Sequence, residues 1–388
     1  MTKKVTISHL TVCMFSYFFP PQYSGAALQA LSLAKKLREK GIGIIFLTVN
    51  HNKLSNIDEI EGFKVYRINE GCGRFNEVLL WKNMLTFFRN QKNNFDIIHS
   101  HGAYLRNSFV GLISKFLGKK SLVKISLSNN DLYGLGNDRN GWLHRRFISM
   151  VDKYVSISRE ITDELKGYGL QDKKIKEISN GVDIERFFQI SHEEKLRLRK
   201  RFALPENGLM LLYVGVIDER KNVKWLADTW SSFCNDYPGY LVVVGPISRE
   251  NKDLRLYNSI KAYKDKLKDK LFLIQYTDRI EKFYQMADIF VLPSTNEGMP
   301  NVVLEAMASG ISCLVNGVSG IKDIVNDKNG IVFDIEKPET FLKGLVSLRN
   351  YSIRAEIGST ARKTIVKDFS IDSIAEKYLD LYEEMLGT

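Results

Sequence analysis

The sequence has few cysteines, and their positions suggest no shared role. The four cysteines are far apart, with no C-x-x-C pair and no Cys/His spacing typical of a zinc site: Cys13, Cys72, Cys234 and Cys313. A disulfide framework and a structural zinc site are therefore disfavoured, and a reducing, cytoplasmic environment is the simplest expectation.

Long apolar runs and several nucleotide-binding motifs are also missing. No window of the chain approaches the roughly 20 apolar residues that a membrane-spanning helix needs, so any membrane contact is expected to be peripheral, on the inner face. The chain has no G-x-x-x-x-G-K-[ST], no G-x-G-x-x-G and no Asp-x-Asp. These absences disfavour P-loop, dinucleotide and metal-held diphosphate chemistry, and we expect neither a metal ion nor a cofactor.

The amino-terminal residues resemble a secretion signal only superficially. Lys3 and Lys4 precede an apolar-leaning stretch, residues 5–19, but polar residues interrupt it and no clean A-x-A-like cleavage site follows. We expect a folded segment instead, with the first strand of a sheet at residues 5–7.

The chain contains enough apolar residues for two domains. It has 388 residues, of which 44% are hydrophobic and 26% charged, values typical of globular proteins. Apolar runs typical of buried strands alternate with helix-period segments, which predicts α/β domains built on doubly wound, Rossmann-like parallel sheets. The strands are expected at residues 43–48, 63–68, 97–99, 121–125 and 153–156, and then at 209–214, 240–244, 271–274, 289–292, 312–315 and 331–332, with helices that include 26–40 and 104–117.

A charged helical stretch, residues 191–201, separates the two series of strands. We therefore predict a first domain of residues 1–190 and a second of residues 191–369, followed by an amphipathic helix at residues 370–388. Ligands of open α/β sheets bind beyond the carboxyl ends of the strands, so the important residues are expected just after strands.

The positive charge is confined to the first half of the chain. Residues 1–190 contain 28 Lys and Arg against 17 Asp and Glu, which accounts for the whole net charge of +11, whereas residues 191–388 are balanced. A basic half is typical of proteins that contact nucleic acid, an anionic membrane surface or a phosphorylated substrate. A merely solvated basic surface is an equally good interpretation.

The strongest motif follows the strand expected at residues 289–292. It places Glu297 and Glu305 eight residues apart across a strand-to-helix turn, in which Pro300 suits the first helical position. The first backbone amides of such a helix and its positive dipole end can bind an anion such as a diphosphate. The candidate binding residues in this turn are Gly298, Met299, Asn301 and Val302.

This Glu-x7-Glu segment resembles the retaining glycosyltransferases of the GT-B fold, specifically glycosyltransferase family 4, and the resemblance covers essentially the whole chain. It implies two Rossmann-like domains facing across a cleft, an acceptor-binding domain followed by a nucleotide-sugar donor domain, with the last helix crossing back onto the first. It also implies that Glu297 lies close to the transferred sugar and that Glu305 binds the ribose hydroxyls.

A second segment fits the same resemblance. Arg220 and Lys221 follow the strand expected at residues 209–214, where the guanidinium fork and the ammonium charge can neutralise a departing diphosphate. An Arg-Lys pair alone is usually a solvated turn, and its position in the chain gives it most of its weight.

Two residues of the first domain complete the candidate site. Gly25 precedes the helix expected at 26–40 and lets backbone amides approach an anion, although the family often has Gly-Gly where this chain has Ser24-Gly25. His101 lies at a strand end, and the resemblance places it near the sugar and the acceptor. From chemistry alone, a strand-end histidine is more often structural.

The resulting hypothesis is a retaining, metal-independent hexosyltransferase. It would transfer a hexose or N-acetylhexosamine from a UDP-sugar, or secondly a GDP-sugar, to a glycan or lipid-linked acceptor in cell-surface polysaccharide synthesis. Aromatic and basic segments at residues 81–89 and 142–147 could rest on an anionic membrane, or could equally be ordinary amphipathic helices with Trp81, Leu85 and Phe88 buried. The alternatives are a GT-B-like sugar-nucleotide epimerase and a non-catalytic nucleic-acid or polyanion-binding protein, although no nucleic acid is expected as a partner.

Overall fold

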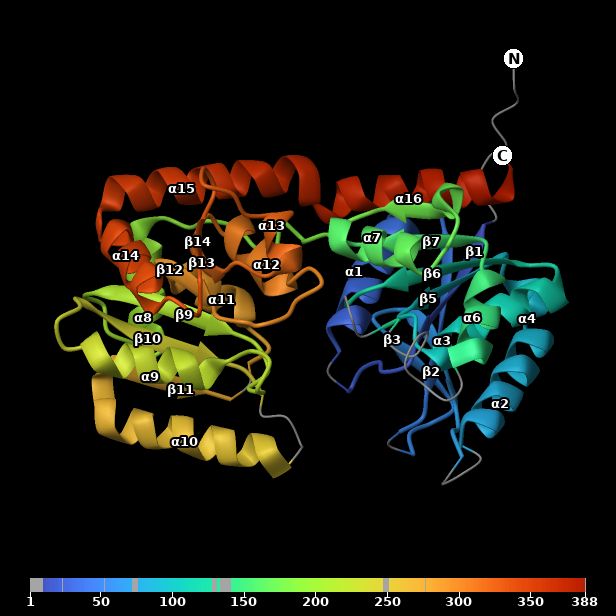
Figure 1. The fold of residues 1–388 in the computed structure, drawn as a ribbon, viewed down its shortest axis with the longest axis horizontal. Helices are drawn as coiled ribbons and strands as arrows, with labels where there is room; N and C mark the ends of the chain where they lie inside the picture. Colours follow the sequence, from blue (N-terminus) through green and yellow to red (C-terminus); the bar gives the residue numbers. More distant parts are fainter. Residues whose placement is uncertain are drawn as a thin grey trace, which may run out of the picture. The chain divides into compact units, whose positions relative to one another are not determined.

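A computed structural model describes residues 10–22, 24–51, 53–71, 76–127, 131–132, 141–246, 251–275 and 277–387. The chain forms two compact units, coloured by sequence in Figure 1. Unit 1 comprises residues 1–181 and 371–388, and unit 2 comprises residues 182–370. The sequence placed the division at residue 190, whereas residues 182–190 are part of unit 2. The chain crosses between the units twice, at residues 181–182 and 370–371. Next to these crossings, the amide of Val182 donates a hydrogen bond of 2.9 Å to the carbonyl of Phe369.

Unit 1 is built on a mainly parallel sheet in the order β3-β4-β2-β1-β5-β6-β7-β8 among its described residues, with only β3 antiparallel to its neighbour. The central strands are buried on both faces, which explains their nearly continuous apolar runs. The strands are β1 (Thr11–Ser16), β2 (Gly43–Val49), β3 (Ile57–Ile60), β4 (Phe63–Ile68), β5 (Ile97–His101), β6 (Lys120–Ile125), β7 (Lys153–Ser156) and β8 (Ile175–Glu177).

Helices cover this sheet, and the last helix of the chain is one of them. Its inner face carries buried tyrosines and aliphatic residues that join the core cluster of unit 1, and it packs against the first helix. The expected return of the terminal helix to the first domain is therefore present within this unit (Figure 1). The helices are α1 (Gly25–Glu39), α2 (Asn76–Asn90), α3 (Leu105–Ser108), α4 (Val110–Leu117), α6 (Gly141–Ser149), α7 (Arg159–Gly167) and α16 (Ile371–Leu386).

Unit 2 has a fully parallel sheet in the order β11-β10-β9-β12-β13-β14. Its strands are β9 (Leu209–Val214), β10 (Gly239–Val244), β11 (Leu271–Ile274), β12 (Ile289–Leu292), β13 (Ser312–Asn316) and β14 (Ile331–Phe333). Its helices are α8 (His192–Arg201), α9 (Val223–Phe233), α10 (Asn251–Leu267), α11 (Ile280–Met286), α12 (Asn301–Ala308), α13 (Ser319–Lys322), α14 (Pro338–Arg349) and α15 (Tyr351–Thr364), and a π-helical turn at Ile365–Phe369 leads toward α16.

Three local expectations differ from the structure, and a fourth concerns residues that it does not describe. The strand expected at residues 5–7 lies outside the described residues, and the first described strand is β1. The expected helix at 104–117 is interrupted at Phe109, which separates α3 from α4; the ring of Phe109 stacks on Trp81. Strands β3 and β8 were not anticipated, because a short edge strand lacks a long apolar run. Pro300 is the N-cap of α12, with ψ 112, and the helix begins one residue later.

Candidate functional site

The candidate site in unit 2 lies where the order of its sheet reverses. From β9 the chain proceeds outward to β10 and β11, and then returns to place β12 on the other side of β9. The loops that leave the carboxyl ends of β9 and β12 therefore meet beside one another, at the position where open α/β sheets bind their ligands. Arg220 and Lys221 belong to the first loop, and Glu297 belongs to the second.

A buried ion pair joins these two loops. The Nζ atom of Lys221 lies 2.5 Å from Oε1 of Glu297, and Nη1 of Arg220 lies 3.1 Å from Oε2 of the same carboxylate. Glu297 is 5% exposed and Lys221 9% exposed. The structure thus brings three sequence-predicted residues together across 76 positions of the chain.

The backbone holds these side chains in place. The amide of Thr295 donates to the carbonyl of Arg220 at 2.9 Å, and Nη1 of Arg220 donates to the carbonyl of Asn296 at 2.7 Å. The Asp218 carboxylate accepts a hydrogen bond of 2.8 Å from the amide of Lys221. These bonds fix the geometry of the loops before any ligand arrives, which is what electrostatic preorganisation requires.

The charges around Glu297 determine its protonation state. Burial alone would raise the pKa of this carboxyl group, but the charges of Lys221 and Arg220 lower it below its ordinary value. Glu297 is therefore ionised at neutral pH, and one carboxylate faces two cations. Together, the side chains of Glu297, Lys221 and Arg220 carry one net positive charge.

The turn before α12 is packed tightly from behind. A Cβ atom on Gly320 of α13 would lie 1.6 Å from the carbonyl oxygen of Gly298, so only glycine allows this approach. Met299 is 5% exposed and helps to anchor the turn. The backbone amides of Asn301 and Val302 lie in the first turn of α12, at the positive end of the helix dipole.

Glu305 lies further along α12 and has a different environment. Its Oε2 accepts a hydrogen bond of 2.8 Å from the hydroxyl of Tyr284 on α11. Its side chain is only partly exposed, and burial raises its pKa to about 7, while the bond to Tyr284 and the charge of Arg186 counteract this in part. Tyr284 was not identified from the sequence. A tyrosine on the apolar face of a short helix looks like any other core residue, and nothing near it in the sequence indicates a contact with Glu305.

The sheet of unit 1 reverses its order between β1 and β5, and the two candidate residues of this unit follow those strands. Gly25 is the first residue of α1, and the side chain of Ser24 caps the helix by accepting a hydrogen bond from the amide of Ala27. His101 ends β5.

His101 is buried in a cluster of basic and aromatic side chains. Its ring stacks on that of His99 at a centroid distance of 4.2 Å, and neither of its ring nitrogens has a hydrogen-bond partner among the described residues. Burial, with the charges of His99 and Lys124, lowers its pKa well below the ordinary value of 6.5. His101 is therefore neutral at pH 7.

Lys124 belongs to the same cluster and was missed from the sequence. It lies beside His101 in the register of β5 and β6, it is 4% exposed, and burial lowers its pKa to about 7. Its position inside an apolar strand run was the feature of the sequence that could have identified it as a buried lysine. Tyr378 and Tyr382 of α16 cover the cluster, and the hydroxyl of Tyr382 lies 2.8 Å from Nδ1 of His99.

Two family models match the chain. Residues 23–186 match the one described as Glycosyltransferase Family 4, and residues 194–364 match the one described as Glycosyl transferases group 1. The chain belongs to glycosyltransferase family 4. Its two α/β units have the GT-B fold, as the sequence predicted.

Sequence similarity to curated relatives covers only part of this family 4 chain. It is 29% identical over 220 residues to the Escherichia coli UDP-Gal:alpha-D-GlcNAc-diphosphoundecaprenol alpha-1,3-galactosyltransferase, which covers 55% of each protein. It is 27% identical over 242 residues to an uncharacterized glycosyltransferase of Methanocaldococcus jannaschii, covering 60% of this chain and 61% of that protein. The chain thus spans less than two thirds of the length of these relatives.

Solved structures are similar over nearly the whole chain. The sucrose-phosphate synthase of Thermosynechococcus elongatus has a TM-score of 0.81 at 16% identity, covering 97% of this chain and 99% of that one. The HepE protein of Anabaena in complex with UDP and glucose has a TM-score of 0.79 at 15% identity, covering 97% and 100%. At such low identity these likenesses support the fold and not the substrates.

Two observations concern metal ions and membranes. Among the described residues, no group of three or more His, Cys, Asp or Glu side chains is placed to hold a metal ion, and no helix is long and apolar enough to cross a membrane. On α2, Phe88 is fully buried, whereas Trp81 and Leu85 are only partly buried, and the ring of Trp81 contacts those of Phe109 and Phe147. On α6, by contrast, Trp142 is 68% exposed.

Proposed function

We propose that this family 4 chain is a hexosyltransferase that moves a hexose or N-acetylhexosamine from a nucleoside diphosphate sugar to an acceptor hydroxyl, with retention of anomeric configuration. The observation that carries the proposal is the placement of Lys221 and Arg220 around Glu297, next to the amino terminus of α12. Two fixed cations and a helix dipole end suit a diphosphate, which gains negative charge as it departs.

Each residue then has a distinct part in the reaction. Lys221 and Arg220 stabilise the departing diphosphate, and Glu297 orients the hydroxyls of the transferred sugar. In unit 1, neutral His101 contacts the acceptor side, and Gly25 lets the backbone come close to the donor. The departing phosphate oxygen accepts the acceptor proton on the same face of the sugar, so no covalent enzyme intermediate and no metal ion are required.

The remaining donor contacts involve α12. Glu305 binds the ribose hydroxyls, and Tyr284 holds its carboxyl group in one orientation. The backbone amides of Asn301 and Val302, with Gly298 and Met299 shaping the turn, bind the diphosphate oxygens.

A UDP-sugar is the favoured donor and a GDP-sugar the second choice. Support comes from the name of the Escherichia coli relative, a UDP-Gal-dependent galactosyltransferase, and from the UDP complex of the Anabaena structure. The same relative acts on a sugar carried by diphosphoundecaprenol, which favours a lipid-linked or other glycan acceptor in surface polysaccharide synthesis.

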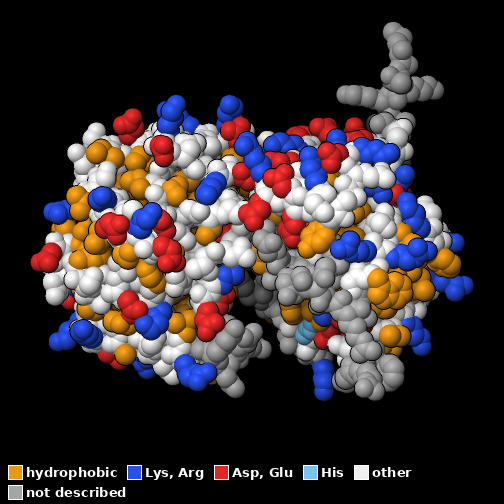
Figure 2. Space-filling view, viewed as in Figure 1, with side chains coloured by type: hydrophobic (Ala, Val, Ile, Leu, Met, Phe, Trp, Pro, Cys, Tyr) orange, Lys and Arg blue, Asp and Glu red, His pale blue; other side chains and the backbone are white. Residues whose placement is uncertain are grey.

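Contact with an anionic membrane surface, on the cytoplasmic side, is part of this proposal. Arg145 and Arg146 are exposed beside Trp142 on α6, and Phe116 of the neighbouring α4 is 69% exposed. Figure 2 shows apolar side chains gathered with Lys and Arg around them on the part of unit 1 that contains these helices. Exposed aromatic rings beside cations are typical of peripheral membrane surfaces.

A thermal-shift screen against UDP, GDP, ADP and TDP, with and without EDTA, tests the donor site, because a ligand of the folded state raises the unfolding temperature. We expect the largest shift with UDP, no effect of EDTA, and loss of the shift in Lys221→Ala. Lys224→Ala is the matched control, since Lys224 is an exposed lysine of α9 that pairs with Asp228. An absent shift with every nucleotide, or an equal loss in the control, contradicts the proposal, and NMR of the product anomer tests retention.

A further inference from the structure

A cavity of about 570 Å³ lies at the opposite edge of the unit 2 sheet from the ion pair of Glu297. Its wall includes Leu209 and Ser312, where β9 and β13 begin, and Asp288, which immediately precedes β12. Because β9 is six residues long, this amino edge is roughly 20 Å from the carboxyl edge. The cavity is therefore distinct from the ion pair that Glu297 forms with Lys221 and Arg220.

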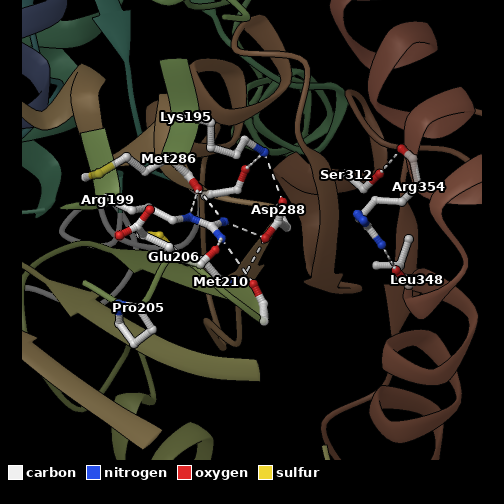
Figure 3. A network of polar contacts seen from close by, with 12 residues as sticks. Lys195, Arg199, Pro205, Glu206, Met210, Met286, Asp288, Ser312, Leu348 and Arg354 are labelled. Atoms are coloured by element: carbon white, nitrogen blue, oxygen red, sulfur yellow. Dashed lines mark hydrogen bonds and ion pairs between the residues drawn. The ribbon is translucent and has the colours of Figure 1, made fainter. Parts of the chain in front are cut away.

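Two of the cations in its wall share one carboxylate. Nζ of Lys195 lies 2.9 Å from Oδ1 of Asp288, and Nη2 of Arg199 lies 2.6 Å from Oδ2 of the same residue (Figure 3). Arg199 also donates to the carbonyl oxygens of Met286 and Gly208, so its guanidinium is fully engaged. Both oxygens of Asp288 are thus paired with cations.

Two further arginines in the wall have no carboxylate partner among the described residues. Nη1 of Arg354 donates to the carbonyl of Leu348 at 2.6 Å, and Figure 3 shows its guanidinium on the far side of the network from Arg199. No hydrogen bond from its Nε or Nη2 is found within the described parts of the chain. Arg349 is exposed, and its guanidinium lies 5.9 Å from the ring centroid of Tyr237.

The pKa of Lys195 is lowered mainly by burial. Burial lowers its pKa, Asp288 counteracts this, and the neighbouring charges of Arg199 and Arg354 lower it further. The wall contains four Lys and Arg side chains, Lys195 included, against the two carboxylates of Asp288 and Glu206. The cavity therefore has more cations than anions.

An unpartnered amide provides a second, independent indication of a ligand. Gln285 belongs to the wall and is 3% exposed, its Oε1 accepts a hydrogen bond from Lys282, and its buried Nε2 has no acceptor among the described residues. A buried donor without an acceptor costs about 1–3 kcal/mol, so an acceptor supplied by a ligand would remove a penalty.

We propose that this cavity is a binding site for a small phosphorylated metabolite, with Arg354 as the main phosphate contact and Arg349 as the second. The free edge of a guanidinium presents two parallel donors that match phosphate oxygens. The volume exceeds that of a phosphate group and suits a sugar-sized body, for which the rings of Tyr284 and Tyr351 form part of the wall. Tyr284 also holds Glu305, so the cavity and the proposed donor site share one side chain.

The test uses inorganic phosphate and ribose 5-phosphate as probes in titration calorimetry of the full chain, at constant ionic strength and with chloride as the reference anion. We expect both probes to bind, ribose 5-phosphate more tightly, and Arg354→Gln to weaken both at least ten-fold. Arg349→Gln should weaken binding less, and it guards against misfolding because its side chain is exposed. Arg197→Gln is the matched control, since Arg197 is an exposed arginine of α8 that pairs with Glu193.

Lys221→Ala separates this site from the proposed donor site. It should leave phosphate binding unchanged while abolishing nucleotide binding. If phosphate binding is lost in Lys221→Ala and retained in both Arg354→Gln and Arg349→Gln, the probe occupies the donor site and the proposal is wrong. It is equally wrong if neither probe binds at millimolar concentration, and either result leaves the glycosyltransferase proposal intact.

Discussion

Each unit contains a buried lysine, but the two lysines have opposite electrostatic environments. In unit 2, Lys221 lies 2.5 Å from the carboxylate of Glu297, whose pKa is lowered. In unit 1, Lys124 is as deeply buried but has no carboxylate within ion-pair distance among the described residues, and its pKa is lowered to about 7. The first arrangement keeps permanent charges in place, and the second favours loss of the proton.

This difference suits the two halves of the proposed reaction. A diphosphate requires cations that stay charged, which a compensating carboxylate provides until the donor arrives. An acceptor hydroxyl requires neutral hydrogen-bonding groups, such as the stacked rings of His99 and His101, whose pKa values are well below 6.5. The net charge of +11, which resides in residues 1–190, therefore does not describe the chemistry of this buried cluster.

Removal of the Glu297 charge should have the largest effect. Glu297→Gln leaves Lys221 and Arg220 adjacent in a buried site without a counter-charge, and the free energy of unfolding should fall by about 3–5 kcal/mol. Urea unfolding measures this change. Glu281→Gln breaks a more exposed pair with Arg186 and should cost no more than about 1 kcal/mol, so equal effects would show that burial does not set the difference.

The buried lysine of unit 1 should make the stability of the protein depend on pH. Because the pKa of Lys124 is lowered to about 7 from 10.5, the unfolded chain binds more protons between these values, and stability rises with pH by up to about 1.4 kcal/mol per unit. Lys124→Met should remove this rise. Unfolding at pH 7, 8 and 9 measures the difference between the two proteins, in a range where His99 and His101 stay neutral.

An identical slope in wild type and Lys124→Met would mean that Lys124 is not the titrating group. The matched control is Lys115→Met, because Lys115 is half-exposed on α4 and pairs with Asp152. Its substitution should leave the slope unchanged.

Glu305 gives a smaller pH effect in unit 2, with the reverse sign. A carboxyl pKa raised from 4.5 to about 7 means that the folded state binds the extra proton, so the stabilisation is complete below pH 4.5 and is lost as pH rises through 7. The unfolding temperature of wild type relative to Glu305→Gln should therefore fall between pH 5 and 8. Tyr284→Phe should move this loss to higher pH, because the hydrogen bond from Tyr284 lowers the pKa; no movement would contradict the assigned contact.

The sequence predicted the site of unit 2 better than that of unit 1 for a physical reason. Arg220, Lys221 and Glu297 follow strands, and parallel neighbouring strands bring their carboxyl ends together, so strand positions and the topological rule sufficed. The cluster around His101 depends instead on Tyr382, which is 283 residues from its partner His99 along the chain, and no local pattern shows such a pairing. The short edge strand β3 was missed because its exposed residues carry no burial signal.

The smallest expected effect concerns the two tyrosines that cover this cluster, and it compares them directly. Tyr382→Phe removes the hydroxyl that bonds to Nδ1 of His99, so the free energy of unfolding should fall by about 1 kcal/mol. Tyr378→Phe removes a buried hydroxyl that has no partner among the described residues, and it should be neutral or stabilising. Both rings are fully buried on α16 and keep their packing, so urea unfolding of the two variants isolates the hydroxyl; a loss in Tyr378→Phe as large as that in Tyr382→Phe would show that the His99 bond is not what distinguishes them.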